Sequence, residues 1–439
     1  MKSLFRCIIA LPFLFLWINY STGQSYTGYN LPLEVRSAYQ KGTRSVTGMP
    51  GPNYWQNSAR YKIKAELLHE ESQLSAEEVV VYYNNSPDTL ENIVIRLYQD
   101  IYKKGNPRQF PIDAEALTDG ILIRSFLLNG ESIDLDDRKR VRKTATNLIV
   151  GLQSPLHPGD SATMEISWQF DISLKRPLRM GNYGDDRFFV AYWYPQVAVY
   201  DDIDGWDLVE YAGMVEFYND FNDFDVEITT NDGFMVWATG ELENRKEIFS
   251  GQVLEKYYKA LDSDEIEMIF TAEDCRKGKV LKEAGQIKWR FKASHVPDFS
   301  FASTRFANWE ASSVLVDEEK GRRVLVDAVY DDSARTFMHT AEQARNSVAY
   351  MSRILPGYPF PYNHMTNFDN GRNGGGMETP MMANNGDPKG LPNASATIFH
   401  EIAHTYFPFF MGVNERKYAW MDEGWSAFFP CGFMEKDSP

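Results

Sequence analysis

The sequence contains 439 residues, of which 43% are hydrophobic and 14% aromatic, so it excludes a disordered chain and can bury several hydrophobic cores. Its formal net charge of -16 argues against nucleic acids and anionic membrane surfaces as partners. We therefore expect a globular protein that divides into two or three domains.

Residues 1–23 have the pattern of a Sec-type signal peptide. Lys2 and Arg6 precede an apolar run, Cys7–Ile18, and small residues follow at Ser21–Gly23. An N-terminal membrane anchor is disfavoured, because the run has about a dozen residues and a spanning helix needs about 20. We predict cleavage near Gly23 and export to the periplasm or the extracellular space. No other segment is apolar enough to span a bilayer, so we expect no stable membrane insertion.

A lead-in segment, 24–55, is expected before the first domain, 56–300, in which apolar and polar residues alternate repeatedly. The alternation is clear in Tyr61–Leu67, Met164–Phe170 and Phe224–Ile228, and it is typical of strands with one buried face. Turns that contain Asn and Gly separate such runs. We therefore predict an all-β domain with low helix content and large twisted sheets.

The pattern changes in the C-terminal part, where apolar residues recur at steps of three and four. This helical period covers residues 333–355. A second helix is expected to begin near Asn393 or Ser395, either of which can cap it, and to end at Pro408. A third helix is expected to begin close to Asp422.

The second of these helices carries the motif His-Glu-x-x-His, formed by His400, Glu401 and His404. Residues four apart on a helix point the same way, so the two imidazoles can bind one metal ion while Glu401 faces the water on it. A catalytic zinc site needs a third protein ligand. Glu423 follows His404 after eighteen intervening residues, where an antiparallel helix could return it to the metal. We predict one Zn²⁺ per chain, held by His400, His404 and Glu423.

This set of residues suits hydrolysis. Zn²⁺ lowers the pKa of its bound water to about 7 and polarises a peptide carbonyl, and a carboxylate beside it can move the proton to the leaving amine. Glu401 is the candidate for that general base. A pair of ordinary core histidines is the alternative. It is disfavoured because two of only seven histidines lie at ligand spacing beside a carboxylate.

A glycine-rich segment, Asn373–Pro380, lies about twenty residues before the motif. Its glycines, among them Gly375 and Gly376, let the backbone approach another chain closely, as a substrate lying against a sheet edge requires. Taken alone, the segment could equally be a turn, and Glu378 could be a surface acid.

The three features together carry a family resemblance. Gly375-Gly376-Met377-Glu378, the His-Glu-x-x-His motif and the distant Glu423 resemble the aminopeptidase N (membrane alanyl aminopeptidase) family of gluzincin zinc metallopeptidases. The resemblance covers most of the chain that follows the predicted signal peptide, and its zinc motifs are highly specific.

The resemblance implies an α+β multidomain fold, with a saddle-like all-β N-terminal domain followed by a partial thermolysin-like α/β catalytic domain, 301–439. It also implies that Glu378 binds the free α-amine of a peptide substrate, with Gly375, Gly376 and Met377 beside it. A carboxylate at the closed end of a cleft pairs with an N-terminal ammonium and fixes which bond meets the metal.

Several features depart from that family. Thr379 stands where the family usually has Asn or a similar residue, Tyr406 where it usually has Trp, and Asp422 where it mostly has Asn. These changes bear on substrate preference rather than on the metal. The family also has a transition-state-stabilising Tyr several dozen residues beyond the third ligand, whereas this sequence ends at Pro439, sixteen residues after Glu423. We therefore expect a fragment or truncated product of a longer enzyme.

The leading hypothesis is an exported zinc-dependent aminopeptidase that hydrolyses N-terminal peptide bonds with Glu401 as general base. One alternative is a zinc hydrolase of this fold without a preference for a free N-terminus. Another is a non-catalytic peptide-binding protein on the same scaffold. An intact Glu401 argues against the binding protein, because binding alone does not need that carboxylate. The sequence predicts neither the preferred first residue of the substrate nor the oligomeric state.

Overall fold

The chain divides into two compact units, Met1–Tyr54 and Trp55–Pro439. In the first unit, helix α1 (Leu33–Lys41) ends at Gly42, whose left-handed backbone (φ 73°) lets its N–H donate to the carbonyl of Tyr39. The predicted signal peptide lies outside the described residues. The computed structural model describes residues 31–174, 179–184, 186–372, 374–387 and 391–437.

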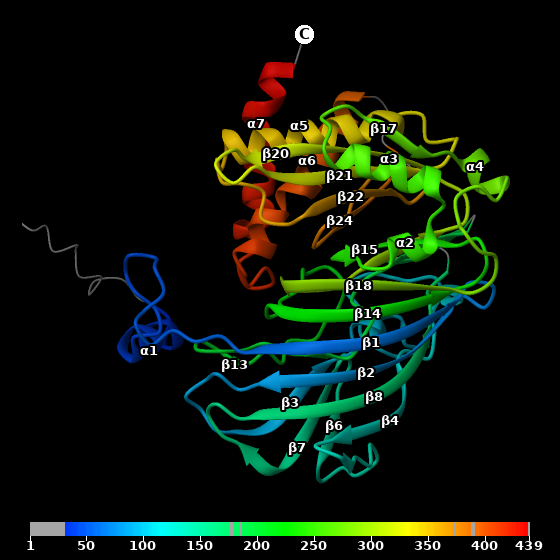
Figure 1. Ribbon diagram of the computed structural model, residues 1–439. Coiled ribbons are helices and arrows are strands. Elements are labelled where there is room, and N and C mark those ends of the chain that lie inside the picture. Colours follow the sequence, from blue (N-terminus) through cyan, green and yellow to red (C-terminus); the bar gives the residue numbers. More distant parts are fainter. Residues whose placement is uncertain (1–30, 175–178, 185, 373, 388–390, 438–439) are drawn as a thin grey trace, which may run out of the picture. The chain divides into compact units, whose positions relative to one another are not determined.

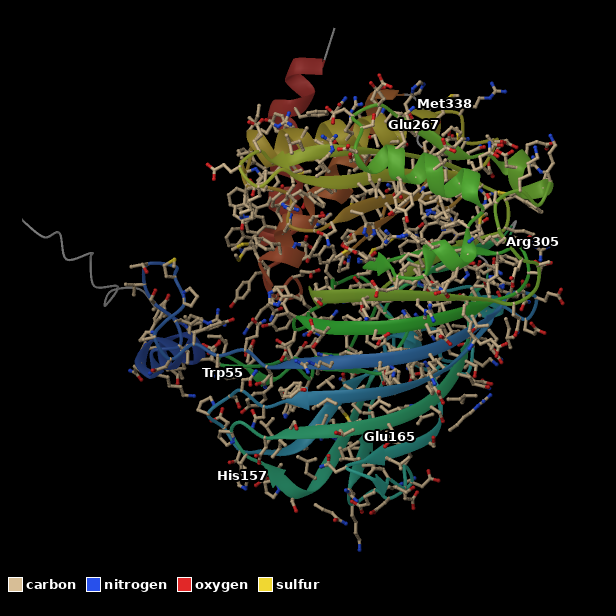
Figure 2. All side chains as sticks on the ribbon, viewed as in Figure 1. Trp55, His157, Glu165, Glu267, Arg305 and Met338 are labelled. Atoms are coloured by element: carbon tan, nitrogen blue, oxygen red, sulfur yellow. The ribbon has the colours of Figure 1, made fainter. Side chains whose placement is uncertain are left out.

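The second unit begins with an eight-stranded sheet, in which the strands lie in the order β16-β18-β14-β1-β2-β8-β4-β5 (Figure 1). Neighbouring strands are antiparallel except β1 and β14, which are parallel. Buried and exposed residues alternate along the long strands, and Glu165 of β8 is exposed between two buried neighbours (Figure 2). In chain order the strands are β1 (Ser58–Leu68), β2 (Gln73–Tyr83), β4 (Leu122–Leu128), β5 (Glu131–Ser132), β8 (Ser161–Asp171), β14 (Asn222–Thr230), β16 (Glu241–Leu242) and β18 (Ile287–Val296).

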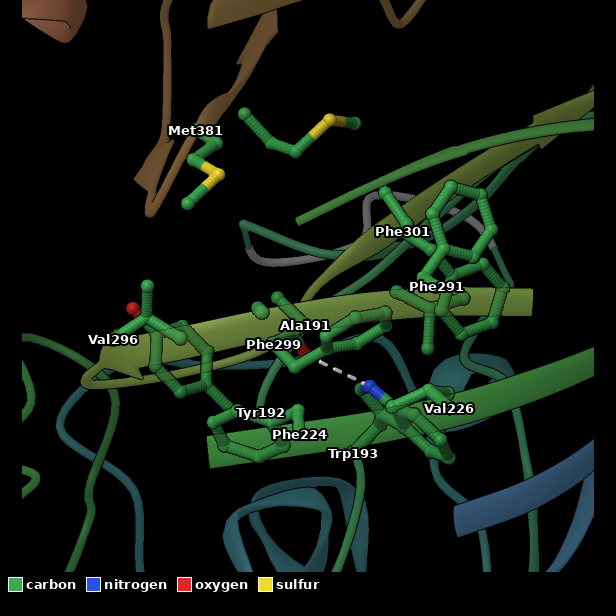
Figure 3. Packing of buried hydrophobic residues seen from close by; sticks show 14 of the residues in the cluster. Ala191, Tyr192, Trp193, Phe224, Val226, Phe291, Val296, Phe299, Phe301 and Met381 are labelled. Carbon is green, nitrogen blue, oxygen red and sulfur yellow. Dashed lines mark hydrogen bonds between the residues drawn. The ribbon is translucent and has the colours of Figure 1, made fainter. Parts of the chain in front are cut away.

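Three smaller sheets share one hydrophobic cluster with the large sheet; their orders are β15-β19-β10-β9, β11-β3-β7-β6 and β12-β13. Figure 3 shows aromatic side chains of this cluster, where the indole N–H of Trp193 donates to the carbonyl of Phe299 at 3.0 Å. The strands are β3 (Leu90–Arg96), β6 (Val141–Lys143), β7 (Asn147–Leu156), β9 (Gly181–Gly184), β10 (Arg187–Val190), β11 (Gln196–Val197), β12 (Tyr200–Asp201), β13 (Gly205–Trp206), β15 (Met235–Ala238) and β19 (Phe301–Thr304), with the short helices η1 (Tyr98–Tyr102) and η2 (Ala114–Ala116).

A six-stranded sheet in the order β17-β20-β21-β22-β24-β23 forms the C-terminal part, and β23 and β17 are its two edge strands. Helix α5 contacts β20, β21 and β22, and α6 contacts both α5 and α7 (Figure 1). The strands are β17 (Glu267–Phe270), β20 (Asn308–Asp317), β21 (Arg322–Tyr330), β22 (His364–Asp369), β23 (Glu378–Thr379) and β24 (Met382–Asn385). The helices after β16 are α2 (Arg245–Ile248), α3 (Gly251–Leu261), α4 (Ala272–Arg276), η3 (Phe337–His339), α5 (Thr340–Arg353), α6 (Leu391–Ala403), η4 (Thr405–Phe410), η5 (Ala419–Met421) and α7 (Glu423–Asp437).

The predicted α+β class is confirmed, and the three alternating segments form β1, β8 and β14. The expectation of an all-β stretch through residue 300 needs a correction, because α2, α3 and α4 interrupt it. In α3 the apolar residues Val253, Tyr257 and Ala260 recur at steps of four and three, a helical period that the strand assignment overlooked. Helix α3 contacts β17, β20 and β21, so it belongs with the C-terminal sheet.

Strand pairing also crosses the predicted domain boundary at residue 300. Strand β17, which precedes it in sequence, pairs with β20 of the C-terminal sheet. Strand β19, which follows it, pairs with β10 and β15 of the β-rich part. The two parts therefore exchange strands within one compact unit.

The predicted helices are present, but both ends of the second one differ: α6 begins at Leu391, so the expected caps Asn393 and Ser395 lie inside it. Helix α7 begins at Glu423, next to the expected start, and α5 lies within the predicted helical stretch. Helix α6 ends at Ala403, before the expected Pro408, and a π-helix, Thr405–Phe410, follows it. Phe407, inside that segment, has non-helical backbone angles, because the residue before a proline is disfavoured in the α conformation. Among the described residues, no helix has the length and apolarity needed to cross a membrane.

Candidate metal centre

Helices α6 and α7 bring together the three residues that were predicted to hold a metal. His400 Nε2 lies 3.2 Å from His404 Nε2 and 3.2 Å from Glu423 Oε2. One ligand atom from each residue lies within 4.8 Å of the other two. Ligands about 2.0 to 2.1 Å from a tetrahedral zinc ion lie roughly 3.3 Å from one another. The spacing of the three atoms therefore fits a Zn²⁺ ion.

The ends of the two helices set this geometry. His400 lies in the last turn of α6, His404 directly follows its last residue, Ala403, and Glu423 is the first residue of α7. The rings of Phe399 on α6 and Phe433 on α7 have centroids 4.9 Å apart, and Phe407 of η4, which follows α6, packs on Trp425 of α7 at 5.5 Å. The packing of these apolar rings fixes the helix pair without using the polar groups of the site.

A second carboxylate orients His404. The Nδ1 atom of His404 lies 2.6 Å from Asp422 Oδ1, and both side chains are fully buried. Ser426 Oγ lies 3.1 Å from the same nitrogen. A proton on Nδ1 that is donated to Asp422 leaves the lone pair on Nε2, which is the atom that faces His400 and Glu423. Sequence analysis noted Asp422 only as a family departure, and it missed Ser426.

The charges around the histidines favour a cation. Burial opposes protonation of His404, but the charge of Glu378 and the hydrogen bond to Asp422 outweigh it and raise the pKa of His404 to about 10. The hydrogen bond with His400 holds the pKa of Glu423 below its usual value. In the metal-free chain His404 is therefore protonated at neutral pH, and a metal ion has to displace a proton from it in order to bind.

Glu401 lies beside the ligands and is buried, with only 6% of its surface exposed. Its Oε2 atom is buried and has no hydrogen-bond partner among the described residues. Burial, followed by the charge of Glu378, raises the pKa of Glu401 to about 7. A carboxylate in this state is suited to take up and release a proton near neutral pH.

The glycine-rich segment lies against Glu401. A methyl group at Gly376 would overlap the carboxylate of Glu401 and lie 2.7 Å from its Cγ, so only glycine leaves room for that side chain. Met377 and Asn384 exchange two backbone hydrogen bonds, at 3.0 and 2.9 Å, and the N–H of Gly386 donates to Gly375 at 2.9 Å. These bonds place the segment alongside β24, at the free edge of the sheet.

Glu378 is not the surface acid that the segment alone allowed. Only 6% of it is exposed, and a carboxylate oxygen lies within 4.8 Å of ligand atoms of both His404 and Asp422. A carboxylate oxygen of Glu378 also lies within 4.8 Å of carboxylate oxygens of Glu216 and Glu415. The structure therefore joins the predicted substrate-binding carboxylate to the metal-ligand cluster.

The cluster that includes Glu216 and Glu415 was missed by sequence analysis. Glu415 is buried, and burial raises its pKa well above the usual value. Glu216 forms a two-point ion pair with Arg179, whose Nη1 atom lies 3.6 Å from the sulfur of Met377. No local pattern marks these residues, because they come from three distant parts of the chain. Their excess of carboxylates makes this end of the site attractive to a cation.

Comparisons with known proteins bear on the fold. No protein-family model matches the sequence, and no curated protein matches it. An M1 zinc metallopeptidase from Deinococcus radiodurans is 13% identical, over 88% of this chain and 72% of its own, with a TM-score of 0.50. A mutant two-domain M1 zinc metallopeptidase bound to L-tryptophan is 14% identical, over 88% of this chain and 73% of its own, with a TM-score of 0.52.

Aminopeptidase A from Legionella pneumophila, solved in complex with aspartic acid, is similar in fold as well. It is 12% identical and matches 90% of this chain but only 39% of its own length, with a TM-score of 0.54. The chain therefore has the fold of M1 zinc metallopeptidases, in agreement with the predicted resemblance at the level of fold.

Proposed function

We propose that this chain is a zinc-dependent aminopeptidase that hydrolyses the N-terminal bond of peptides. One observation carries the proposal: two imidazole nitrogens and a carboxylate oxygen lie at zinc-ligand spacing beside Glu401, a buried carboxylate with one oxygen that has no partner in the described part of the chain. The similarity in fold to M1 zinc metallopeptidases and to an aminopeptidase supports it.

We propose one zinc ion per chain, held by His400, His404 and Glu423. When bound, zinc lowers the pKa of water and polarises a carbonyl. The chain's own contribution is to fix the three ligands on two packed helices and to hold His404 in one tautomer through Asp422.

Glu401 is the proposed general base and then general acid. Burial disfavours its charged form, while a cation at the neighbouring ligands favours it, so the two effects keep its pKa within reach of neutral pH. It can therefore accept a proton from the attacking water and release the proton to the leaving amine.

Glu378 is the proposed anchor for the substrate's free α-amine. It is buried at the end of the site, and Glu415 and Glu216 add negative charge around it. An N-terminal ammonium that pairs with this carboxylate sets which peptide bond reaches the metal ligands. The backbone of Gly375, Gly376 and Met377, at the open edge of the sheet, would lie along the substrate backbone.

We further propose that the protein is exported and meets its peptides in the periplasm or the extracellular space. The pattern of residues 1–23 supports this proposal. The net charge of -16 is consistent with peptides rather than nucleic acids or anionic membranes as partners.

The proposal is tested with an aminoacyl chromogenic amide and its N-acetylated counterpart, each assayed with and without a metal chelator. Glu401→Gln should lower kcat on the free-amine substrate by about 10²-fold to 10⁴-fold while zinc stays bound. Glu378→Gln should lower kcat/KM on the free amine by about 10²-fold and leave any slow cleavage of the blocked substrate unchanged. Glu165→Gln, an exposed carboxylate on β8, is the matched control.

Each alternative gives its own result. Equal loss on free and blocked substrates in Glu378→Gln would indicate a zinc hydrolase without a preference for a free N-terminus. Bound zinc with no cleavage of either substrate would indicate a peptide-binding protein. Cleavage that is unaffected by complete removal of the metal would overturn the proposal.

A further inference from the structure

A cavity of about 360 Å³ is lined by residues of α2 and α3, of β20, β21 and β22 in the six-stranded sheet, and of β15, β16 and β18. None of the predicted metal ligands lines it, and neither Glu401 nor Glu378 does. Its volume falls in the range of roughly 300 to 1,000 Å³ that small-molecule sites occupy in proteins. It is therefore a candidate binding site separate from the metal centre.

Aromatic rings form much of the wall of this cavity. Trp309 is the centre of the group, with ring centroids 5.7 Å from Tyr257, 5.8 Å from Trp237 and 5.9 Å from Phe249. All four residues line the cavity. Such a wall favours a flat apolar group, which can stack on a ring or meet its edge.

A buried carboxyl group in the wall has an unused acceptor. Asp327 of β21 lines the cavity and is 2% exposed. Its Oδ2 atom accepts from the indole N–H of Trp309 at 2.9 Å. Its Oδ1 atom has no hydrogen-bond partner among the described residues, while burial raises the pKa of the carboxyl group to about 7 against the opposing effect of Thr366 and Trp309. Because a buried unpaired acceptor is costly, the site is suited to a ligand that donates hydrogen bonds or carries positive charge.

A guanidinium group with unused donors lines the same cavity. Arg245 donates from Nε to the carbonyl of Leu242 at 3.0 Å, and its Cζ atom lies 5.2 Å from the ring centroid of Tyr257. Within the described ranges, no carboxylate pairs with Arg245, and its bond to Leu242 leaves its two terminal nitrogens without a hydrogen-bond partner. A planar guanidinium of this kind matches a carboxylate with two parallel hydrogen bonds.

The other charged groups of the wall are already engaged. Glu241 accepts from Asn363 at 2.6 Å, and Arg323 pairs with Asp264. Asp327 and Arg245 are thus the acid and the base of the wall with unused hydrogen-bonding atoms deep in the cavity, and the wall as a whole carries two carboxyl and two guanidinium groups. This balance favours a ligand that is neutral overall and carries one charge of each sign.

We propose that this cavity binds a small zwitterion with an apolar ring, for which a free aromatic amino acid is the simplest example. Its carboxylate pairs with Arg245, its ammonium group pairs with Asp327, and its ring lies against the aromatic wall. The inference does not depend on the chain being an enzyme.

The first experiment is calorimetric titration of the whole protein with L-phenylalanine, phenethylamine and 3-phenylpropionate. The two analogues each lack one of the charged groups. L-Phenylalanine should bind at least about tenfold more tightly than either, because each analogue leaves one charged partner unpaired. The titrations are repeated in Glu378→Gln, so that binding at the proposed amine anchor of the metal centre is recognised by its loss there.

The second experiment uses variants of the wall. Arg245→Gln and Asp327→Asn should each weaken L-phenylalanine binding by about tenfold or more. Asp327→Asn keeps an acceptor for Trp309, and Arg245→Gln remains informative should Asp327→Asn fail to fold. Arg290→Gln, which removes a surface guanidinium from β18 outside the cavity, should bind as the unmodified protein does.

Three results would overturn the inference. They are equal affinity for the three compounds, binding that both wall variants leave unchanged, and no heat at about 10 mM L-phenylalanine, which is tenfold above a dissociation constant of about 1 mM.

Discussion

Replacing Gly376 by alanine should abolish most activity without unfolding the protein. The added methyl group would overlap the Glu401 carboxylate, which has to move by about 1 Å to restore a separation above 3.0 Å. Gly376 itself does not have a left-handed backbone, so alanine adds no strain there. The clash falls on the carboxylate and Cγ of one flexible side chain and not on backbone, so a turn of that side chain relieves it at little cost in stability. A displacement of about 1 Å at a reacting group costs about 10²-fold in rate.

Gly374→Ala is the matched control. Gly374 lies two residues earlier with a left-handed backbone (φ 74°), and a methyl group there meets nothing within 4 Å. Alanine at this position should therefore lower the free energy of unfolding by about 1 to 2 kcal/mol and leave kcat/KM nearly unchanged. Gly376→Ala should thus lower activity with little loss of stability, whereas Gly374→Ala should lower stability with little loss of activity.

The assay is kcat/KM on an aminoacyl chromogenic amide, with zinc content and the thermal midpoint measured on the same samples. The double variant Gly376→Ala, Glu401→Gln should be no less active than Glu401→Gln alone, because both changes remove the same group from the reaction. Fully additive losses would contradict the reasoning, as would a Gly376→Ala variant that keeps normal activity or fails to bind zinc.

Three further outcomes are expected. Asp422→Asn should weaken zinc binding by about 10-fold to 100-fold, because His404 loses the carboxylate that orients it; competition with a chelating dye measures this. Zinc added to metal-free protein should raise the thermal midpoint progressively with concentration, and no rise would contradict a site in the folded state. His69 is stacked on Phe234. Burial, followed by the charge of Arg305, lowers the pKa of His69 from 6.5 to about 3. The stabilisation that comes from keeping His69 neutral is complete above pH 6.5 and is lost as the pH falls toward 3. The free energy of unfolding, measured with denaturant, should therefore fall by about 2 kcal/mol between pH 7 and pH 5. His69→Gln should remove this dependence on pH.

The metal-ligand set could be predicted because its geometry is mostly local. His400 and His404 share one helix face by the helical period, and only the return of Glu423 required a tertiary contact. The aromatic packing of α7 against α6 and against η4 provides that contact. The strands of the β-rich part were equally accessible, since one buried face forces alternation in the sequence.

Other parts of the site could not be predicted, because they depend on contacts between distant segments. Arg179 and Glu216 are paired beside Met377, yet about 200 and 160 residues of sequence separate them from it. Glu415 is an ordinary charged loop residue by sequence, and only folding buries it. Only the role of Asp422 could have been predicted from the sequence, because a carboxylate directly before a metal ligand can orient a neighbouring imidazole.

The three consecutive glycines before Met377 show how one short pattern can have two physical causes. Gly374 and Gly375 have left-handed backbones, with φ of 74° and 82°, and a side chain would find open space at both. Gly376 needs no such backbone and instead leaves the volume that Glu401 occupies. A sequence pattern predicts the first cause, since runs of glycine favour turns and close approach. The second is visible only when α6 is placed against the sheet edge, and it makes the position of the proposed general base depend on a residue of another element.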